Sequence, residues 1–121
     1  MRQNEVFLTI ELLYGKCQDL IAYIKAYELA MSIFMISDQI RRSSRSVCTN
    51  LAEAYRRRRY KNYFISKLND CETENGETQV WLEFCRDCSY IDNTEYNQLK
   101  NKNDEVAKLI WYMINKPDKF R

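Results

Sequence analysis

Residues Asp38 to Arg59 read DQIRRSSRSVCTNLAEAYRRRR, a segment with seven arginines and no helix-breaking residue. In and just before it, small and apolar side chains recur every three or four residues, the spacing that places them on one face of a helix. They are Ile36, Ile40, Ser44, Val47, Leu51 and Ala54. Most of the arginines fall outside this stripe. The segment therefore predicts a helix with one face in a core and a basic face outside it.

The rest of the chain predicts three more helices, from about Cys17 to Ile36, from Lys61 to Cys88, and from an Asp92 capping box to Pro117. Their expected core positions are Leu20, Ile24, Tyr27, Met31 and Phe34; then Phe64, Leu68, Cys71, Leu82 and Cys85; then Tyr96, Leu99, Val106, Ile110 and Met113. The 121 residues include two glycines and one proline, which argues against a turn-rich β protein. The expected fold is all-α, an up-down antiparallel four-helix bundle.

The connection between the first two helices has two readings. Ser37 leads directly into Asp38, with no obvious loop between them. Either Ser37 caps a very tight corner, or the two helices merge into one. A merged helix could not fold back on itself, so its halves would have to pack with another chain. We predict that the first helix runs into the second with two or fewer non-helical residues around Ser37, which favours the merged form.

Charge is divided unevenly along the chain, although the net charge is only +2. Between residues 39 and 67, nine Lys or Arg stand against Glu53 alone, whereas between residues 70 and 95, eight Asp or Glu stand against Arg86 alone. This division suits a head-to-tail contact between copies, or a basic surface for an anionic partner. It is equally typical of two solvated helix faces that differ in charge.

Enzyme chemistry has little support in these residues. The chain contains no histidine, which removes Ser-His-Asp and Cys-His arrangements and histidine metal sites. The carboxylates that follow Asp70 lack the Glu-x-x-His pairs of di-metal bundles, and a glycine-rich phosphate loop is absent. We expect no catalytic residue, no metal ligand and no cofactor, and hence a protein that is not an enzyme.

Five cysteines form an odd set: Cys17, Cys48, Cys71, Cys85 and Cys88. Cys85 and Cys88 have the spacing of a zinc knuckle but fall within a predicted helix, so core packing is favoured over a metal site. The start of the chain is a poor signal peptide, and the longest apolar run, residues 29–36, is too short to span a bilayer. We expect a cytoplasmic protein whose cysteines are small buried hydrophobes.

Cationic residues are interleaved with aromatic residues in the run from Tyr55 to Phe64. Arginine can fork onto phosphate, and tyrosine can stack on the bases of single strands. The candidate nucleic-acid-binding residues are Arg41, Arg42, Arg45, Arg56, Arg57, Arg58, Arg59 and Lys61. The alternative is a protein–protein interaction scaffold whose arginines form salt bridges between subunits. A third reading is a solvent-exposed basic surface without a binding role.

Two polar residues of the same segment are expected to be structural. Asn50 lies beside the Leu51 stripe, where its side chain could fix the helix register by hydrogen bonds. Glu53 is the one acid among the arginines, and an ion pair with Arg56 or Arg57, three or four residues on, is expected.

The segments QIRR (residues 39–42) and SVCTNLAEA (residues 46–54) resemble the signature Q-I-R-R…S-x-x-x-N-[IL]-A-E-[GA] of the four-helix-bundle proteins named from intervening sequences of 23S ribosomal RNA genes. ENGETQVWL (residues 74–82) and MINKPDKF (residues 113–120) match further. The chain departs from the pattern at Ala54-Tyr55, where many members have glycine. The resemblance covers roughly residues 18 to 121. It leaves residues 1–16 as an N-terminal extension and 17–121 as the bundle domain.

The resemblance implies a small helical protein, usually pentameric, without an established enzyme activity. A relative, the accessory variability determinant of diversity-generating retroelements, works with a reverse transcriptase and binds nucleic acid. By this likeness we expect a homo-oligomer, with a pentamer favoured, that binds RNA or DNA through its basic second helix. A reverse-transcriptase-type partner is expected by analogy only, and no membrane partner is expected.

Overall fold

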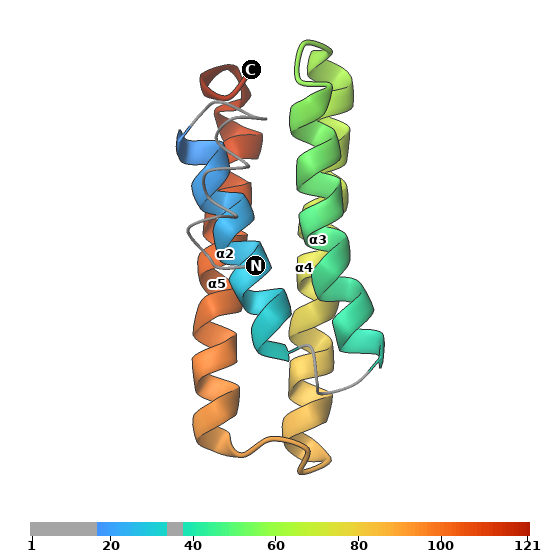
Figure 1. Cartoon of the computed structure of the whole chain (residues 1–121), viewed down its shortest axis with the longest axis vertical. Helices are drawn as coiled ribbons and strands as arrows, with labels where there is room; N and C mark the ends of the chain where they lie inside the picture. Colours follow the sequence, from blue (N-terminus) through green and yellow to red (C-terminus); the bar gives the residue numbers. More distant parts are fainter. Residues whose placement is uncertain (1–16, 34–37) are drawn as a thin grey trace.

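The structure is a computed structural model that describes residues 17–33 and 38–121. In this part of the chain, four α-helices follow one another: α2 (Cys17–Ile33), α3 (Asp38–Arg56), α4 (Lys61–Asp87) and α5 (Asn93–Asn115). A short 3₁₀ helix, η1 (Pro117–Lys119), follows them. The four helices run alternately down and up along one long axis (Figure 1). The predicted all-α, antiparallel four-helix bundle is confirmed.

The connection around Ser37 lies outside the described residues, but the helices on either side of it are informative. α2 and α3 are separate elements that pack against each other within one chain. Two halves of one continuous helix could not make that contact. The predicted merging of the two helices is therefore wrong, and the exchange of helices between chains that it required has no support.

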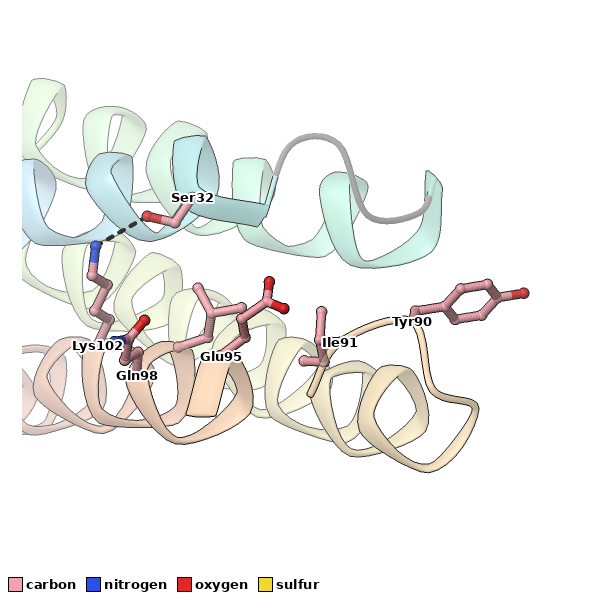
Figure 2. Close-up of a pocket in the computed structure, with 7 residues that line it drawn as sticks. Ser32, Tyr90, Ile91, Glu95, Gln98 and Lys102 are labelled. Carbon is pink, nitrogen blue, oxygen red and sulfur yellow. Dashed lines mark hydrogen bonds between the residues drawn. The ribbon is translucent and has the colours of Figure 1, made fainter. Parts of the chain in front are cut away.

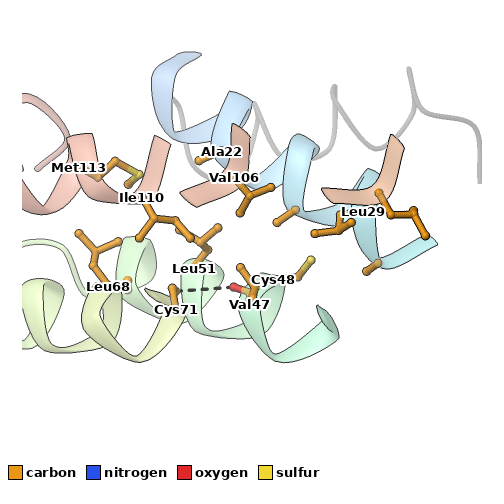
Figure 3. Close-up of a cluster of buried hydrophobic side chains, with 14 of the residues drawn as sticks. Ala22, Leu29, Val47, Cys48, Leu51, Leu68, Cys71, Val106, Ile110 and Met113 are labelled. Carbon is orange, nitrogen blue, oxygen red and sulfur yellow. Dashed lines mark hydrogen bonds between the residues drawn. The ribbon is translucent and has the colours of Figure 1, made fainter. Parts of the chain in front are cut away.

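The core forms where the inner faces of all four helices meet, and Figure 3 shows side chains from these helices converging. The predicted core positions from Ile40 to Ala54, from Phe64 to Cys85 and from Tyr96 to Met113 are all buried. Each large apolar side chain buried in this way stabilises the fold by roughly 1.5–3 kcal/mol relative to an exposed one. The stripes of these three helices were correctly predicted because their large apolar residues recur every three or four positions.

The core face of α2 differs from the prediction. Its buried residues are Ala22, Ala26, Leu29 and Ala30, whereas Met31 is 58% exposed and Ile24 and Tyr27 are half-buried. The side chains of Leu20 and Phe34 lie outside the described residues. α2 is apolar on more than one side, so the larger side chains did not mark the inner face. Alanines mark it instead, because small side chains let α2 lie close to α3 and α5.

Two buried asparagines join α4 to α5. Asn75 Nδ2 donates to the carbonyl oxygen of Asn103 (3.2 Å), and Asn103 Nδ2 donates to the carbonyl oxygen (3.2 Å) and Oδ1 (3.0 Å) of Asn75. These contacts fix how far the two helices can slide past each other, since any slip would leave buried amides without partners. Asn50, for which the sequence predicts a register role, is half-buried on α3 and takes no part in this contact, so its role stays a prediction.

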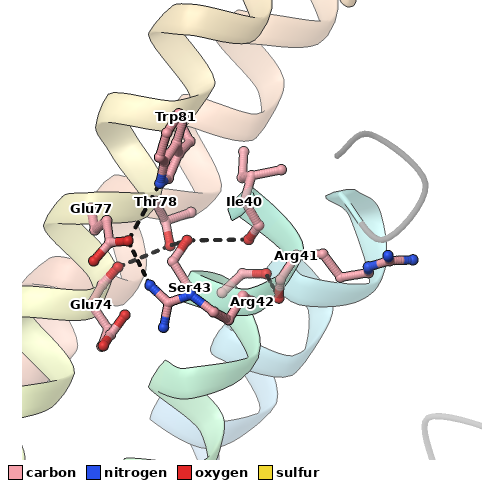
Figure 4. Close-up of polar contacts among 9 residues, drawn as sticks. Ile40, Arg41, Arg42, Ser43, Glu74, Glu77, Thr78 and Trp81 are labelled. Carbon is pink, nitrogen blue, oxygen red and sulfur yellow. Dashed lines mark hydrogen bonds and ion pairs between the residues drawn. The ribbon is translucent and has the colours of Figure 1, made fainter. Parts of the chain in front are cut away.

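A second polar contact joins α3 to α4 (Figure 4). The buried hydroxyls of Ser43 and Thr78 lie 2.9 Å apart, and Ser43 donates to the carbonyl oxygen of Ile40 (3.2 Å). At the edge of this contact, Arg42 Nη2 lies 2.7 Å from Glu77 Oε1. The start of α3 is therefore tied to the middle of α4.

Candidate nucleic-acid interface

α3 separates the predicted basic residues into two groups. Arg45 and Arg56 are eleven residues apart, which is about 16 Å along a helix axis. We call Arg41, Arg42 and Arg45 the N-terminal arginine group, and Arg56, Arg57, Arg58 and Arg59 the C-terminal arginine group. The first lies near the start of α3, and the second at its end, where α3 turns into α4 (Figure 1).

The N-terminal arginine group borders the acidic face of α4. Arg42 is paired with Glu77, which also lies 3.4 Å from the indole nitrogen of Trp81. Arg41 is half-buried and Arg45 is exposed. Arg42 therefore joins α3 to α4 through Glu77, one of the acids of the 70–95 region.

The C-terminal arginine group occupies a tight connection between two helices. α3 ends at Arg56, and backbone hydrogen bonds from Arg57 to Glu53 (3.3 Å) and from Tyr60 to Arg57 (3.0 Å) turn the chain before α4 begins at Lys61. Because this connection is short, the four consecutive arginines lie close to one another at one end of the bundle.

Aromatic rings support these guanidinium groups. Arg58 lies 4.1 Å from the centre of the Tyr55 ring and donates through Nη1 to the Tyr55 carbonyl oxygen (3.0 Å). Arg57 and Arg59 lie 5.6 Å and 4.9 Å from the ring of Tyr60, which is 48% exposed. Such stacking fixes the position of a cation without neutralising its charge. The tyrosines on either side of the arginine run therefore have a local structural role.

Arg121 completes this end of the bundle from the far end of the chain. Its Nε and Nη2 donate to the carbonyl oxygens of Arg58 (3.0 Å) and Arg59 (3.1 Å), and its Nη1 donates to Asp118 (2.9 Å). Asp118 also pairs with Lys61 at 3.3 Å. Hydrogen bonds from Arg121 and Lys61 hold the pKa of Asp118 below its usual value. Arg121 was not predicted as a site residue, because its contacts lie about sixty positions away in the sequence.

Two hollows lie on this basic end. One, of about 320 Å³, is lined by Arg56, Arg58, Arg59 and Arg121; we call it the arginine hollow. The other, of about 410 Å³, is lined by Thr49, Ala52, Glu53, Arg56 and Arg57; we call it the Glu53 hollow. Arg56 borders both. Among the described residues, Arg56, Arg57 and Arg59 form no ion pair, whereas Lys61 is paired with Asp118.

Glu53 has different partners from those expected. Its carboxylate accepts a hydrogen bond from the Tyr63 hydroxyl and lies 3.4 Å from Lys67 Nζ, both on α4. These contacts replace the predicted ion pair with Arg56 or Arg57. The hydrogen bond from Tyr63, followed by the charge of Lys67, lowers the pKa of Glu53. The carboxylate is therefore ionised at neutral pH and can only accept hydrogen bonds.

A third hollow, of about 570 Å³, lies at the other end of the bundle (Figure 2). Ser32 of α2, Tyr90 of the α4–α5 connection and Glu95 and Lys102 of α5 border it, and Lys102 Nζ donates to Ser32 Oγ (3.0 Å). One lysine and one glutamate line it, so it lacks the concentrated charge of the arginine hollow.

The cysteines are mostly core residues. Cys48, Cys71 and Cys85 are buried, and burial raises the pKa of the Cys48 thiol to about 12. Cys88, expected to be buried, is exposed because α4 ends one residue before it; the side chain of Cys17 lies outside the described residues. Within residues 17–33 and 38–121, no three Cys, Asp or Glu side chains are placed to hold a metal ion. No helix in these ranges is both long and apolar enough to cross a membrane.

Comparison with known proteins places this bundle in a family. The sequence model of the 23S rRNA-intervening sequence proteins matches residues 18–112. The fold is similar to the crystal structure of a protein of unknown function from the S23 ribosomal protein family of Bacteroides thetaiotaomicron, with a TM-score of 0.74, 29% identity, and 82% of this chain and 99% of that chain covered. No curated protein sequence matches the chain significantly. This chain belongs to the 23S rRNA-intervening sequence protein family.

Proposed function

We propose that this protein is a non-enzymatic binding protein that holds single-stranded nucleic acid on the C-terminal arginine group and works as a homo-oligomer. One observation carries the proposal: Arg56, Arg58, Arg59 and Arg121 line a single hollow. Like charges gathered in this way repel one another, and a phosphate placed among them would remove that cost. Planar guanidinium groups also match the oxygens of phosphate better than any other cationic side chain does.

The arrangement is suited to a nucleic-acid strand because part of it is already ordered. Arg58 is held by the Tyr55 ring and carbonyl, and Arg121 by the carbonyl oxygens of the turn. Less side-chain freedom is therefore lost when an anion binds. Arg56 and Arg59 are exposed, and Tyr60 places an aromatic ring beside them for stacking on an unpaired base.

A second role, in protein assembly, is favoured by a different surface. On the outer side of α4, Val80 and Phe84 are 49% and 56% exposed, and the Phe84 and Trp81 ring centres lie 5.6 Å apart. An apolar patch of this kind suits a contact between copies of the chain. The two roles are compatible, because the patch and the arginine hollow involve different residues. The pentamer that the family resemblance favours belongs to this proposal.

Salt dependence tests the nucleic-acid proposal. Fluorescently labelled single-stranded RNA is titrated with the protein at about 50 mM and about 200 mM salt, where affinity should fall by roughly 0.7 log unit per log unit of salt for each phosphate contact. The double variant Arg56→Ala/Arg59→Ala should bind more weakly and show a slope smaller by about 1.4. Arg45→Ala, an exposed arginine on the same helix, is the matched control and should change affinity less.

Light scattering and circular dichroism on the same samples show whether each variant keeps its assembly and helix content. If the wild type does not bind RNA at low salt, or if the double variant binds as well as the wild type, the proposal is wrong. Phe84→Asp tests the second role, since it should shift the assembly toward smaller species. If the wild type is a monomer at micromolar concentration, the assembly role is excluded.

A further inference from the structure

The Glu53 hollow contains a feature that phosphate binding alone does not explain. Arg56 and Arg57 line it, yet Glu53 places a carboxylate between them and the neighbouring helix α4. A carboxylate repels phosphate, so it weakens a surface whose only task is to hold a nucleic-acid backbone. Glu53 is also held in place by Tyr63 and Lys67. A fixed acid beside cations suits a ligand that carries hydrogen-bond donors next to an anionic group.

The carboxylate of Glu53 keeps free acceptor sites. Tyr63 donates to Oε1, and Lys67 Nζ approaches Oε2 at 3.4 Å, so each oxygen has one partner. A carboxylate offers about four lone-pair positions, two on each oxygen. The side chain is 46% exposed and lines the hollow, so a ligand there can reach the remaining positions. Both oxygens can therefore accept from one ligand at the same time.

Among the bases of RNA, guanine fits this acceptor pair. Its Watson–Crick edge presents two adjacent donors, N1–H and the 2-amino group, which match the two oxygens of a carboxylate. Adenine and cytosine place an acceptor nitrogen beside their amino group, and uracil flanks its N3–H with two carbonyl oxygens. That edge is free only in unpaired nucleotides, which is how proteins read single-stranded RNA.

We propose that Glu53 binds the Watson–Crick edge of an unpaired guanine while Arg56 holds the adjacent phosphate in the arginine hollow. This inference rests on the proposed function, because it assigns a base to the strand that the arginines hold. Arg56 borders both hollows, so base and phosphate can be bound side by side. The volume of about 410 Å³ lies within the range typical of small-ligand sites. Ala52 keeps the hollow open, and Tyr63 and Lys67 are positioning residues.

Three RNAs of equal length test the inference by fluorescence anisotropy at one low salt concentration: all-uridine, the same strand with guanine at every third position, and that strand with inosine replacing guanine. The wild type should bind the guanine strand at least about fivefold more tightly than the uridine strand, the effect of a two-point contact to a base. Inosine lacks the 2-amino group, so its strand should bind with intermediate affinity.

Two variants remove the preference by different routes. Glu53→Gln replaces one acceptor by a donor, so it should bind all three strands alike while its affinity for the uridine strand stays the same or rises. Ala52→Leu fills the hollow without changing any charge, and should also lose the guanine preference while it still binds uridine RNA. Glu72→Gln changes an exposed acid on α4 that does not line the hollow; it is the control and should keep the preference.

The outcomes separate this inference from the proposed function. If the wild type binds guanine and uridine strands equally, the guanine site is disproved while nucleic-acid binding stands. If Glu53→Gln weakens all strands equally in a folded protein, Glu53 is structural and the inference is wrong. If the wild type binds none of the strands, the proposed function fails and the inference fails with it.

Discussion

Asn75 and Asn103 hydrogen-bond to each other across the buried interface of α4 and α5, each side chain donating to the other residue's carbonyl oxygen at 3.2 Å. They are 3% and 1% exposed, so neither amide can exchange this partner for water. The pair fixes one register between two helices whose remaining contacts are mostly apolar and would tolerate sliding. The positions of the side chains at the two ends of the bundle depend on that register.

Replacing one asparagine of this pair should lower the free energy of unfolding more than replacing both. Asn103→Leu leaves the amide of Asn75 buried without a partner, so the free energy of unfolding should fall by about 1–3 kcal/mol. Asn75→Leu/Asn103→Leu leaves no unpaired side-chain amide and should recover much of the loss. Urea unfolding followed by circular dichroism measures both. A double variant as unstable as the sum of the two single variants would contradict this role for the pair.

Gly76 offers a stabilising change. It lies in the interior of α4, it is exposed, and a Cβ atom added there would meet nothing within 4 Å. Glycine in a helix interior costs roughly 0.5–1 kcal/mol relative to alanine, because its backbone loses more freedom on folding. Gly76→Ala should therefore raise the free energy of unfolding by about that amount. Gly76→Ser should raise it less, and a decrease for Gly76→Ala in urea unfolding would show that the site needs glycine.

The sequence predicted most of the fold and little of the site. The stripes of α3, α4 and α5 were readable because their large apolar residues recur with the helical period, as Val47, Leu68 and Ile110 illustrate. In α2 the inner face is formed largely by alanines, and these buried alanines were missed.

The site depends on contacts between distant positions, which periodicity does not encode. Glu53 reaches Tyr63 and Lys67 on the next helix, and Arg121 reaches the turn after α3. The residue types of the basic run, arginines flanked by tyrosines, led us to predict an anionic ligand. They did not show that Arg121 joins Arg56, Arg58 and Arg59 around one hollow, because that follows from how the helices are placed.

Stability at acidic pH should depend on Asp118. Its carboxylate receives hydrogen bonds from Arg121 and Lys61, which lower its pKa in the folded state. A lowered pKa contributes stability that is fully present above the ordinary value of about 3.9 and is lost as the pH falls through the folded-state value. Asp118→Asn should therefore lower the urea midpoint at pH ~6, and by a smaller amount at pH ~2.5. Equal differences between variant and wild type at both pH values would rule out this carboxylate as the cause.

The planar geometry of the Arg121 side chain, and not only its charge, should keep the turn at the basic end of the bundle ordered and its affinity for RNA high. Its guanidinium group donates to the carbonyl oxygens of Arg58 and Arg59 and to Asp118, and a lysine ammonium cannot reproduce that planar fork. Arg121→Lys keeps the charge but should loosen the turn that carries Arg58 and Arg59, and RNA affinity should fall severalfold. Lys119→Ala removes a charge from η1, where Lys119 Nζ donates to the Tyr112 hydroxyl at 2.7 Å, without touching the turn.

RNA affinity and the exchange of the backbone amide hydrogens of residues 57–60 separate the two explanations. If geometry controls the site, Arg121→Lys speeds exchange in the turn and weakens binding more than Lys119→Ala does, although Lys119→Ala alone changes the net charge. If charge alone controls the site, the order reverses: Lys119→Ala weakens binding, while Arg121→Lys binds like the wild type. In that case the ordered arginine hollow would have no advantage over a diffuse basic surface.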